Sequence, residues 1–563
     1  MCLDLYALAL AEMLELPYGL DELQICKYYD NATIPMDSHV PTFAGILALL
    51  IAYKVFRFIR SHNGSTKPKK GTKVPEPGVA LPFIGHLHLL NARIPYFRTF
   101  SAMAEKYGPI FCVKLGCHPT IVVNSREIAK ECLTTNDRVF ASRPNTSASR
   151  LLGYNNAVFG LAPYGNYWRE IRKMAVLEIF SNYRLEKLKH VRDTETLSLV
   201  KDLYSSISSA KNVKGSTEVA ISNLLEHMTF NIIVRMIAGK RFGGDTVNEE
   251  DNEALKLRKA IKDATYLCGI FVVADAIPSL SWFDFQGHVR FMKKTAKKLD
   301  AILQKWLEEH VKMRGDKKNG GCERDFMDVM LSSFEGQEDF CGYKREIVIK
   351  ATSVLLVLTG SGSTAITLIW ALSLLLNHPK VLKAAQQELD TNVGKERWVQ
   401  ESDIKNLNYL RAIIKETLRL YPPAPLTGIR EAMEDCCVAG YHVPKGARLL
   451  INLWELQRDP EVWSNPNEFN PARFLTTHQD IDFMSQNFEL VPFSFGRRSC
   501  PGMTFGLQVL HLTLARLIQG FDMCTKDGAE VDLTEGLGVA LPKENELQLT
   551  LAPRLPLMLY ESL

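Results

Sequence analysis

A ten-residue loop around one cysteine constrains this chain more than any other stretch. Residues 493–502 read Phe-Ser-Phe-Gly-Arg-Arg-Ser-Cys-Pro-Gly, so Cys500 lies between two glycines and shortly after two arginines. Glycine lets the backbone fold closely around the sulfur and aim N–H groups at it, and such groups tune a thiolate that binds a metal. The alternative is a buried structural cysteine, the common fate of a free thiol. The loop pattern favours a thiolate metal ligand.

Two further segments carry polar residues at helical spacing. In residues 407–420, apolar side chains recur at helical spacing between a polar start and a Tyr-Pro-Pro end, and Glu416 and Arg419 lie three residues apart. Upstream, Trp168 and Arg172 lie one helical turn apart, so an indole N–H and a guanidinium can reach the same anion. Taken alone, the first pair is also compatible with a solvated surface ion pair. The second is also compatible with an interface tryptophan beside a surface arginine.

Together these residues resemble the cytochrome P450 family. The resemblance runs from about Leu81 to the C-terminus, with the segments in the family's order. The family's cysteine-loop pattern, Phe-x-x-Gly-x-Arg-x-Cys-x-Gly, is met at Phe493, Gly496, Arg498, Cys500 and Gly502. The resemblance implies a mainly α-helical fold with small β-sheets around haem b, bound in part by this loop.

The resemblance also implies roles for single residues. Cys500 is then the iron ligand, and a thiolate in that position pushes electron density onto the iron and favours O–O bond cleavage. The implied contacts of the haem propionates are Trp168, Arg172, Arg430 and Arg498. In the family, a Glu-x-x-Arg helix pairs with the arginine of a later Pro-x-Arg-Phe turn, which here implies a buried network of Glu416, Arg419 and Arg473. We expect that network to be scaffolding, because buried ion clusters fix register better than they add stability.

Residues 351–376 contain no charged side chain and are long enough to span a membrane. A span there would place Trp168 and Arg172 on the opposite side of the membrane from Cys500. We therefore predict a long buried helix over the cofactor, with small polar residues at its centre that suit a kink.

The centre of this segment, residues 359–364, reads Thr-Gly-Ser-Gly-Ser-Thr and departs from the family pattern Ala/Gly-Gly-x-Asp/Glu-Thr-Thr/Ser. Gly362 stands where the acid is expected, and Ser363 replaces the first threonine. In the family's monooxygenases the acid and the hydroxyl help to deliver protons during oxygen activation. Ser363 and Thr364 remain as candidate catalytic residues, and water beside them can complete a proton relay.

The main interpretation is a monooxygenase, and the missing acid keeps alternatives open. Slower turnover and release of peroxide are two of them. A third is an oxidative cyclisation, coupling or rearrangement without oxygen insertion. A non-catalytic haem-binding protein is an alternative of another class.

The N-terminal region predicts a membrane anchor. Residues 40–55 are mostly apolar with Lys54 as their single charge, and basic residues follow as far as Lys73, which keeps that side cytoplasmic. A cleaved signal peptide is the alternative, but no small-residue cleavage site precedes the basic stretch. We divide the chain into an atypical extension (1–35), an anchor (36–60), a basic and proline-rich linker (61–80) and a haem-thiolate catalytic domain (81–563). By resemblance to microsomal members, we expect a single-pass protein of the endoplasmic reticulum membrane with its catalytic domain in the cytosol.

Composition narrows the partners. A net charge of +4 over 563 residues is too weak to imply nucleic-acid binding, and the twelve cysteines lack paired C-x-x-C spacing. Cys112 and Cys117 suggest at most half of a zinc site, so we expect ordinary packing there. The resemblance implies electrons from NADPH through a partner reductase docked on a basic face, with cytochrome b5 as a second donor.

Several segments resemble a plant subgroup of the family, among them residues 153–157 and 509–517. That subgroup includes alkaloid hydroxylases, N-demethylases and terpenoid or phenolic oxidases. The resemblance implies a small to medium-sized apolar specialised metabolite as substrate. We expect substrate contacts from the central helix and from three loops: residues 142–159, 424–428 and 536–540.

Overall fold

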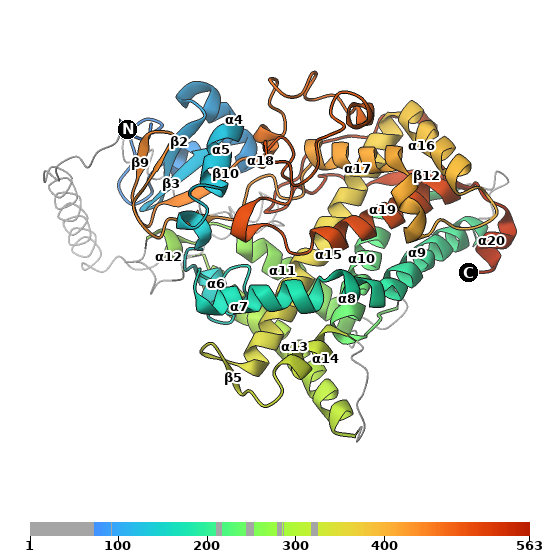
Figure 1. Ribbon diagram of the computed structural model, residues 1–563, viewed down its shortest axis with the longest axis horizontal. Coiled ribbons are helices and arrows are strands. Elements are labelled where there is room, and N and C mark those ends of the chain that lie inside the picture. Colours follow the sequence, from blue (N-terminus) through green and yellow to red (C-terminus); the bar gives the residue numbers. More distant parts are fainter. Residues whose placement is uncertain are drawn as a thin grey trace, which may run out of the picture.

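The computed structural model describes residues 72–91, 93–209, 217–243, 253–277, 284, 286–316 and 325–563 (Figure 1). Over these ranges the protein is mainly helical with four small sheets, which confirms the predicted class of fold. The predicted extension (1–35), the predicted anchor (36–60) and residues 61–71 of the linker lie outside the described residues.

Long helices form the body of the molecule (Figure 1). They are α4 (Tyr96–Tyr107), α9 (Lys189–Ser209), α10 (Ile221–Ala238), α11 (Glu253–Gly269), α13 (His288–Asp316), α15 (Arg345–Asn377), α16 (Pro379–Asn392), α17 (Asn408–Leu420) and α19 (Met503–Gly520). Shorter helices join them: α5 (Arg126–Leu133), α6 (Ser147–Leu151), α7 (Asn166–Met174), α8 (Asn182–Lys187), α12 (Val273–Ala276), α14 (Phe326–Ser333), α18 (Leu453–Leu456) and α20 (Leu557–Glu561).

The strands form four small sheets. One sheet has the order β2 (Ile110–Leu115), β3 (His118–Val123), β10 (Arg448–Ile451), β7 (Arg430–Glu431), with β3 and β10 parallel. A second has the order β1 (Thr72–Lys73), β9 (Tyr441–Val443), β8 (Cys436–Val438), and a third β11 (Phe521–Cys524), β12 (Gln548–Pro553), β4 (Thr217–Ala220). A hairpin joins β5 (Asp339–Phe340) to β6 (Tyr343–Lys344). The first sheet brings Arg430 on β7 toward the cysteine loop.

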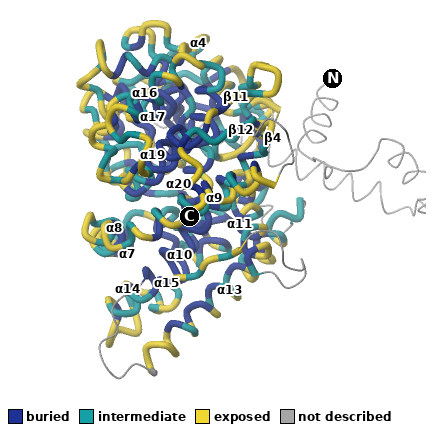
Figure 2. Tube along the Cα trace, turned by 90° about the vertical axis from the view of Figure 1, so that its right-hand side faces the viewer, coloured by how far each residue is buried: buried dark blue, intermediate teal, exposed yellow. Residues whose placement is uncertain are grey.

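Helix α15 forms the centre of the core. It runs as one α-helix through residues 359–364, so the structure shows a continuous helix where the sequence suggested a kink, and it packs against α10, α13, α17 and α19. Among the described residues it is the one helix that could cross a membrane by length and composition, yet 61% of its most apolar stretch is buried inside the protein. Figure 2 shows that the buried residues are concentrated in the interior of the protein, where the central helices lie. The predicted buried helix is confirmed.

The buried network predicted for α17 is also confirmed. Both Arg419 Nε (2.7 Å) and Arg473 Nε (3.1 Å) donate to the Glu416 carboxylate, and all three residues are buried. Arg473 lies in the short 3-10 helix η6 (Pro471–Leu475), and Arg419 also donates to the carbonyls of Gln457 and Pro466. The network therefore joins α17 to a chain segment about fifty residues further along.

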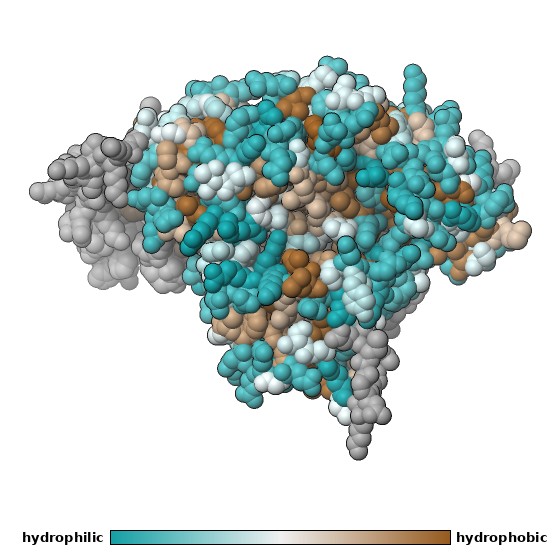
Figure 3. Space-filling view, in the orientation of Figure 1, coloured by the Kyte–Doolittle hydropathy of each residue, from teal (hydrophilic) through white to brown (hydrophobic). Residues whose placement is uncertain are grey.

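The face shown in Figure 3 is largely hydrophilic, with small apolar patches. One patch lies over the junction of α7 and α8, where the π-helical turn η3 (Ala175–Ile179) connects the two helices. Val176 and Leu177 in this turn are 41% and 54% exposed.

Candidate active site

Cys500 lies just before α19, in the loop that the sequence singles out. Gly496 has a φ of 71°, and a Cβ there would lie 2.3 Å from a carboxylate oxygen of Asp137, so this position requires glycine. The loop closes through the Cys500 N–H, which donates to the Phe493 carbonyl at 2.9 Å. Cys500 is deeply surrounded by protein, and its accessible surface faces a cavity that it lines together with Phe493 and Gly502.

Two neighbours favour the charged form of the Cys500 sulfur. Burial raises the pKa of the Cys500 thiol, while the Gly502 backbone N–H and the Arg172 charge oppose the rise. Arg172 is held in place by its Nη2, which donates to the Ser499 carbonyl at 2.7 Å. Its helix α7 also carries Trp168, which lines the same cavity. The predicted Trp-x-x-x-Arg pair therefore meets the predicted cysteine loop.

The Arg498 side chain extends from the cysteine loop to the cavity wall. Its guanidinium donates to three backbone carbonyls, those of Ala141 (2.6 Å), Phe159 (3.2 Å) and Ala162 (2.6 Å). It also lies 4.4 Å from the centroid of the Trp168 ring, in a cation–π contact. Burial and the charges of neighbouring arginines together lower the pKa of Arg498 to about 8.

Arg430, for which the resemblance implies a propionate contact, lies against the cysteine loop. It is 1% exposed, it does not border the cavity, and its Nη2 donates to the Phe495 carbonyl at 3.1 Å and the Ser494 hydroxyl at 3.3 Å. Its Nη1 pairs with Asp137 at 3.4 Å. Arg430 thus supports the cysteine loop through hydrogen bonds without bordering the cavity.

Arg143 is a cavity residue that sequence reasoning did not single out. It lines the cavity and donates to the carbonyls of Gly428 and Ile429. Burial and, to a smaller extent, the charge of Arg430 lower its pKa to about 9. Its only signal in the sequence is its charge, since residues 139–162 contain just one other charged residue, Arg150.

The central helix supplies the opposite wall. Ser363 and Thr364 both border the cavity that Cys500 lines. The Ser363 hydroxyl donates to the Thr359 carbonyl at 2.7 Å, and the Thr364 hydroxyl donates to the Gly360 carbonyl at 3.1 Å. Ser363 is half-buried, whereas Thr364 is 6% exposed. Ser363 is therefore the more accessible of the two candidate catalytic hydroxyls.

The cavity has a volume of about 4670 Å³. A pocket for one small ligand is typically about 300–1,000 Å³, so this space suits a large cofactor together with a substrate and its access path. Residues from all three loops predicted to contact substrate border it, among them Phe159, Thr427 and Val539. The structure thus brings the predicted substrate segments to the same cavity as Cys500.

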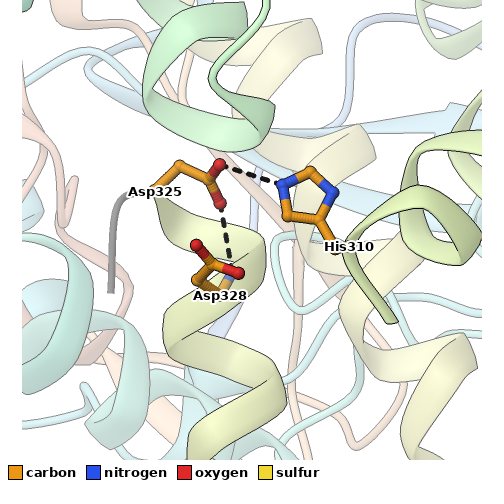
Figure 4. A group of neighbouring side chains, drawn as sticks. All are labelled: His310, Asp325 and Asp328. Atoms are coloured by element: carbon orange, nitrogen blue, oxygen red, sulfur yellow. Dashed lines mark hydrogen bonds and ion pairs between the residues drawn. The ribbon is translucent and has the colours of Figure 1, made fainter. Parts of the chain in front are cut away.

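A separate group of potential metal ligands, His310, Asp325 and Asp328, lies where α13 meets α14 (Figure 4). His310 Nδ1 contacts the Trp306 carbonyl at 2.7 Å, and Nε2 contacts Asp325 at 2.9 Å. Asp325 also accepts the Asp328 backbone N–H and caps α14. Because both imidazole nitrogens have protein partners, we assign this group to a structural ion pair.

Comparison with known proteins identifies the family. The cytochrome P450 family model matches residues 75–550. The chain belongs to the cytochrome P450 family. It is 49% identical to a xanthotoxin 5-hydroxylase of Arabidopsis thaliana, covering 91% of this chain and 98% of the relative. It is 46% identical to a strychnine-10-hydroxylase of Strychnos nux-vomica, covering 92% and 98%. A zebrafish cytochrome P450 solved with progesterone matches 82% of this chain and all of its own, with a TM-score of 0.67 and 26% identity.

These relatives make the chain a cytochrome P450 monooxygenase of the plant type, and the family implies haem as cofactor. The donors around the cavity fit that group. Arg143, Arg172 and Arg498 line a cavity in which burial penalises their charge, and neighbouring arginines add to this at Arg143 and Arg498, so the three favour an anionic ligand such as a pair of carboxylates. Cys500 presents a thiol to the same space, the donor that a haem-thiolate protein requires.

Proposed function

We propose that this cytochrome P450 is a membrane-anchored monooxygenase that oxidises an apolar specialised metabolite, an alkaloid, a terpenoid or a phenolic compound. The observation that carries the proposal is that Cys500, Ser363 and the three substrate loops border one cavity. The hydroxylase relatives support the reaction type. Bound haem would supply oxygen activation, with electrons from NADPH through a partner reductase.

We assign each residue around the cavity a task. Cys500 would bind the iron, and the Gly502 N–H and Arg172 would stabilise its thiolate. From the cavity wall, Arg172, Arg498 and Arg143 would hold the propionate carboxylates through their charges, and Trp168 would do so through its indole N–H. Arg430 acts as a positioning residue, since its hydrogen bonds to residues 494 and 495 set the path of the cysteine loop.

The Ser363 hydroxyl carries a proton at its Oγ. In the structure it donates this proton to the Thr359 carbonyl, one helical turn earlier. A water molecule at the open Gly362 position can pass a proton to it, because a Cβ at that position would meet no atom within 4 Å. The proposed relay thus replaces the missing acid side chain with solvent.

The electron donor docks, in this proposal, over α7 and the turn η3. A small, mainly apolar groove there is lined by Tyr164, Trp168, Arg169, Arg172, Lys173, Val176, Leu177 and Arg497. Its cationic rim suits an acidic partner, and Arg172 in the same groove contacts the cysteine loop. We propose NADPH–cytochrome reductase as the main donor and cytochrome b5 as a second one.

The location follows from residues 36–60, which we propose as a single-pass anchor in the endoplasmic reticulum membrane. The basic residues after it keep the catalytic domain in the cytosol. Protease protection of the full-length protein in microsomes tests this topology, because a cytosolic domain is digested while the vesicles remain sealed.

The ferrous–CO absorption spectrum of the full-length protein tests the haem-thiolate assignment. A Soret band near roughly 450 nm is expected, and Cys500→Ala should abolish it because the thiolate ligand is lost. Cys341→Ala, which removes an exposed cysteine from the β5–β6 turn, is the matched control and should keep the band. A band near roughly 420 nm in all three proteins would contradict thiolate ligation.

A second outcome is favoured by one observation, the glycine at position 362 in place of an acid. Weaker proton delivery would favour oxidative cyclisation, coupling or rearrangement over oxygen insertion. Turnover of the natural substrate under ¹⁸O₂ separates the two outcomes. One labelled oxygen atom in the product supports the monooxygenase, and a consistently unlabelled product supports the alternative.

A further inference from the structure

Arg448 is a buried arginine whose guanidinium makes no hydrogen bond or ion pair within the described part of the chain. It is 9% exposed, and its Nε is buried without an acceptor. Leaving a buried donor unsatisfied is costly, and most structures avoid it. The other buried arginines among the described residues all donate to backbone carbonyls: Arg192, Arg419, Arg430, Arg458, Arg473, Arg498 and Arg516. Arg448 therefore differs from the arginines that hold the fold together.

The position of Arg448 gives these donors a use, because it borders the cavity that Cys500 lines. Arg448 begins β10, which lies beside β3, and α12 lies next to these strands (Figure 1). His118 on β3 contacts the Asp275 carbonyl of α12 at 2.8 Å and so holds α12 against the sheet. Leu450, two residues further along β10, faces the same side as Arg448 and also borders the cavity. Arg448 thus belongs to a wall of the cavity that β10 and α12 form.

The charges around Arg448 are already close to balance. Burial lowers its pKa, and the charges of Glu431 and Asp275 oppose the lowering. Glu431 lies opposite Arg448 on β7 but does not border the cavity. Asp275 accepts hydrogen bonds from the Ser147 N–H and hydroxyl, both at 2.8 Å, and lies 3.6 Å from Arg150. Arg448 therefore lacks hydrogen-bond acceptors rather than an opposite charge.

The carboxylates of the cofactor do not explain Arg448 either. The arginines assigned to the propionates are Arg143, Arg172 and Arg498, and none of them is among the charges that shift the pKa of Arg448. Arg498, by contrast, has its pKa lowered by the charges of the other two. Arg448 thus lies apart from the propionate group, on another part of the same cavity.

We propose that Arg448 binds a neutral carbonyl oxygen of the substrate, such as that of a ketone or a lactone. A carbonyl oxygen accepts hydrogen bonds from the guanidinium without adding a charge, whereas a carboxylate would be repelled by Glu431 and Asp275. The apolar body of the substrate packs against the rest of the cavity wall. This assignment rests on the proposed function and narrows its substrate class to apolar compounds that carry a carbonyl group.

Binding titrations of the haem-loaded, full-length protein test this contact. Two matched pairs differ only in a carbonyl group, flavanone with flavan and menthone with p-menthane, and the dissociation constant is read from the absorbance change of the haem. The wild type should bind the ketone of at least one pair about tenfold more tightly, the effect of a hydrogen bond from a charged donor. Perillate should bind no more tightly than limonene, which has a methyl group in place of the carboxylate.

Variants of Arg448 test whether this residue causes the preference. Arg448→Met removes the donors but keeps an unbranched side chain, so both members of each pair should bind equally. Arg448→Lys should keep part of the preference, because an ammonium also donates but lacks the planar fork. Arg397→Met is the matched control and should keep the full preference, because Arg397 is half exposed and lies away from the cavity.

Melting temperatures separate a binding role from a structural one. A buried guanidinium without partners adds no stabilising contact, so Arg448→Met should leave the melting temperature unchanged or raise it. Arg458→Met should lower it, because Arg458 donates to the carbonyls of Trp454 and Leu420. An equal loss in both variants would make Arg448 a structural residue and overturn the proposal.

Four binding results would also overturn it: equal affinity of the wild type for both members of each pair, a ketone preference that persists in Arg448→Met, a preference for perillate over limonene, or no binding of any of these compounds. A protein that keeps its 450 nm band but fails these titrations refutes the carbonyl contact alone. Loss of the band would instead refute the proposed function.

Discussion

At the scale of the residue, the site depends on where each arginine points. Arg497 and Arg498 are neighbours in the cysteine loop, yet the Arg497 side chain is 44% exposed and pairs with Asp137, whereas Arg498 is buried and serves three backbone carbonyls. The sequence shows two equivalent cations. Only the direction of the chain at Gly496 makes one of them part of the cavity wall.

Arg498→Lys should therefore be costly. A lysine ammonium lacks the planar fork of donors, so it cannot satisfy three carbonyls at once. We expect a loss of about 2–3 kcal/mol in the free energy of unfolding and a lower ratio of haem to protein, measured by urea denaturation and by absorbance. Arg497→Lys is the control, with an expected loss below about 1 kcal/mol because that pair is half exposed. Equal losses would contradict the assignment.

Ser363→Ala tests the proposed proton relay at the same scale. Without the hydroxyl, product formed per NADPH consumed should fall by up to about a hundredfold while peroxide release rises. Thr364→Val should have the smaller effect, because Thr364 is almost fully buried. The measurement is a parallel assay of product, NADPH and peroxide with the reductase. A larger effect at Thr364 would transfer the relay to that residue.

At the scale of the element, buried ion pairs fix how helices and turns join. Glu416 on α17 accepts hydrogen bonds from two buried arginines, one of them on η6. Glu416→Gln should lower the free energy of unfolding by about 3–5 kcal/mol, because it leaves two buried guanidinium charges with no anionic partner in the network. Urea denaturation measures the loss. Arg397→Gln breaks the exposed Arg397–Asp403 pair and should cost less than about 1 kcal/mol.

The α13–α14 junction should respond to pH. Burial lowers the pKa of His310, but the hydrogen bond and charge of Asp325 outweigh it, so the pKa lies above its ordinary value. The stabilisation is then fully present below the unfolded-state pKa of about 6.5 and is lost as the pH rises through the folded-state pKa.

Asp325→Asn keeps a side-chain cap on α14 but removes this charge. The wild type should exceed the variant in unfolding free energy by about 2 kcal/mol at a pH of about 5.5, and the gap should shrink above neutral pH. Urea titrations from acidic to mildly alkaline pH measure it. A gap that grows with pH would contradict the ion pair.

At the scale of the whole molecule, one side of the cysteine loop faces the core and the other faces the α7–η3 groove, the proposed docking surface. The α7–η3 groove presents the exposed Leu177 inside a cationic rim. Leu177→Glu should raise the reductase concentration needed for half-maximal turnover by about tenfold, because it adds a repelled charge at the centre of the docking site. Val311→Glu, at an exposed position on α13 away from both the cavity and the groove, is the control. An equal effect at both positions would contradict docking at α7.

Much of the site follows from short, local patterns. The glycine-flanked Cys500, the Trp168–Arg172 turn and the Glu416–Arg419 turn each lie within one loop or one helix, so sequence spacing already sets their geometry. The Arg473 partner and the buried helix α15 were also predictable, the first from the family's order of motifs and the second because one membrane span would have divided a shared site.

Contacts between distant segments could not be predicted from the sequence. Arg143 lines the cavity, and Arg430 pairs with Asp137 beside the cysteine loop, because three separate segments fold onto one another. The sequence determined the fold family, the glycine-flanked loop around Cys500 and the long buried helix α15. Tertiary structure alone decided which arginines line the cavity. It also decided that Ile233 occupies the space beside Gly360, while the space beside Gly362 stays open. The physical reason is that burial, charge repulsion and free space depend on atoms brought from elsewhere in the chain.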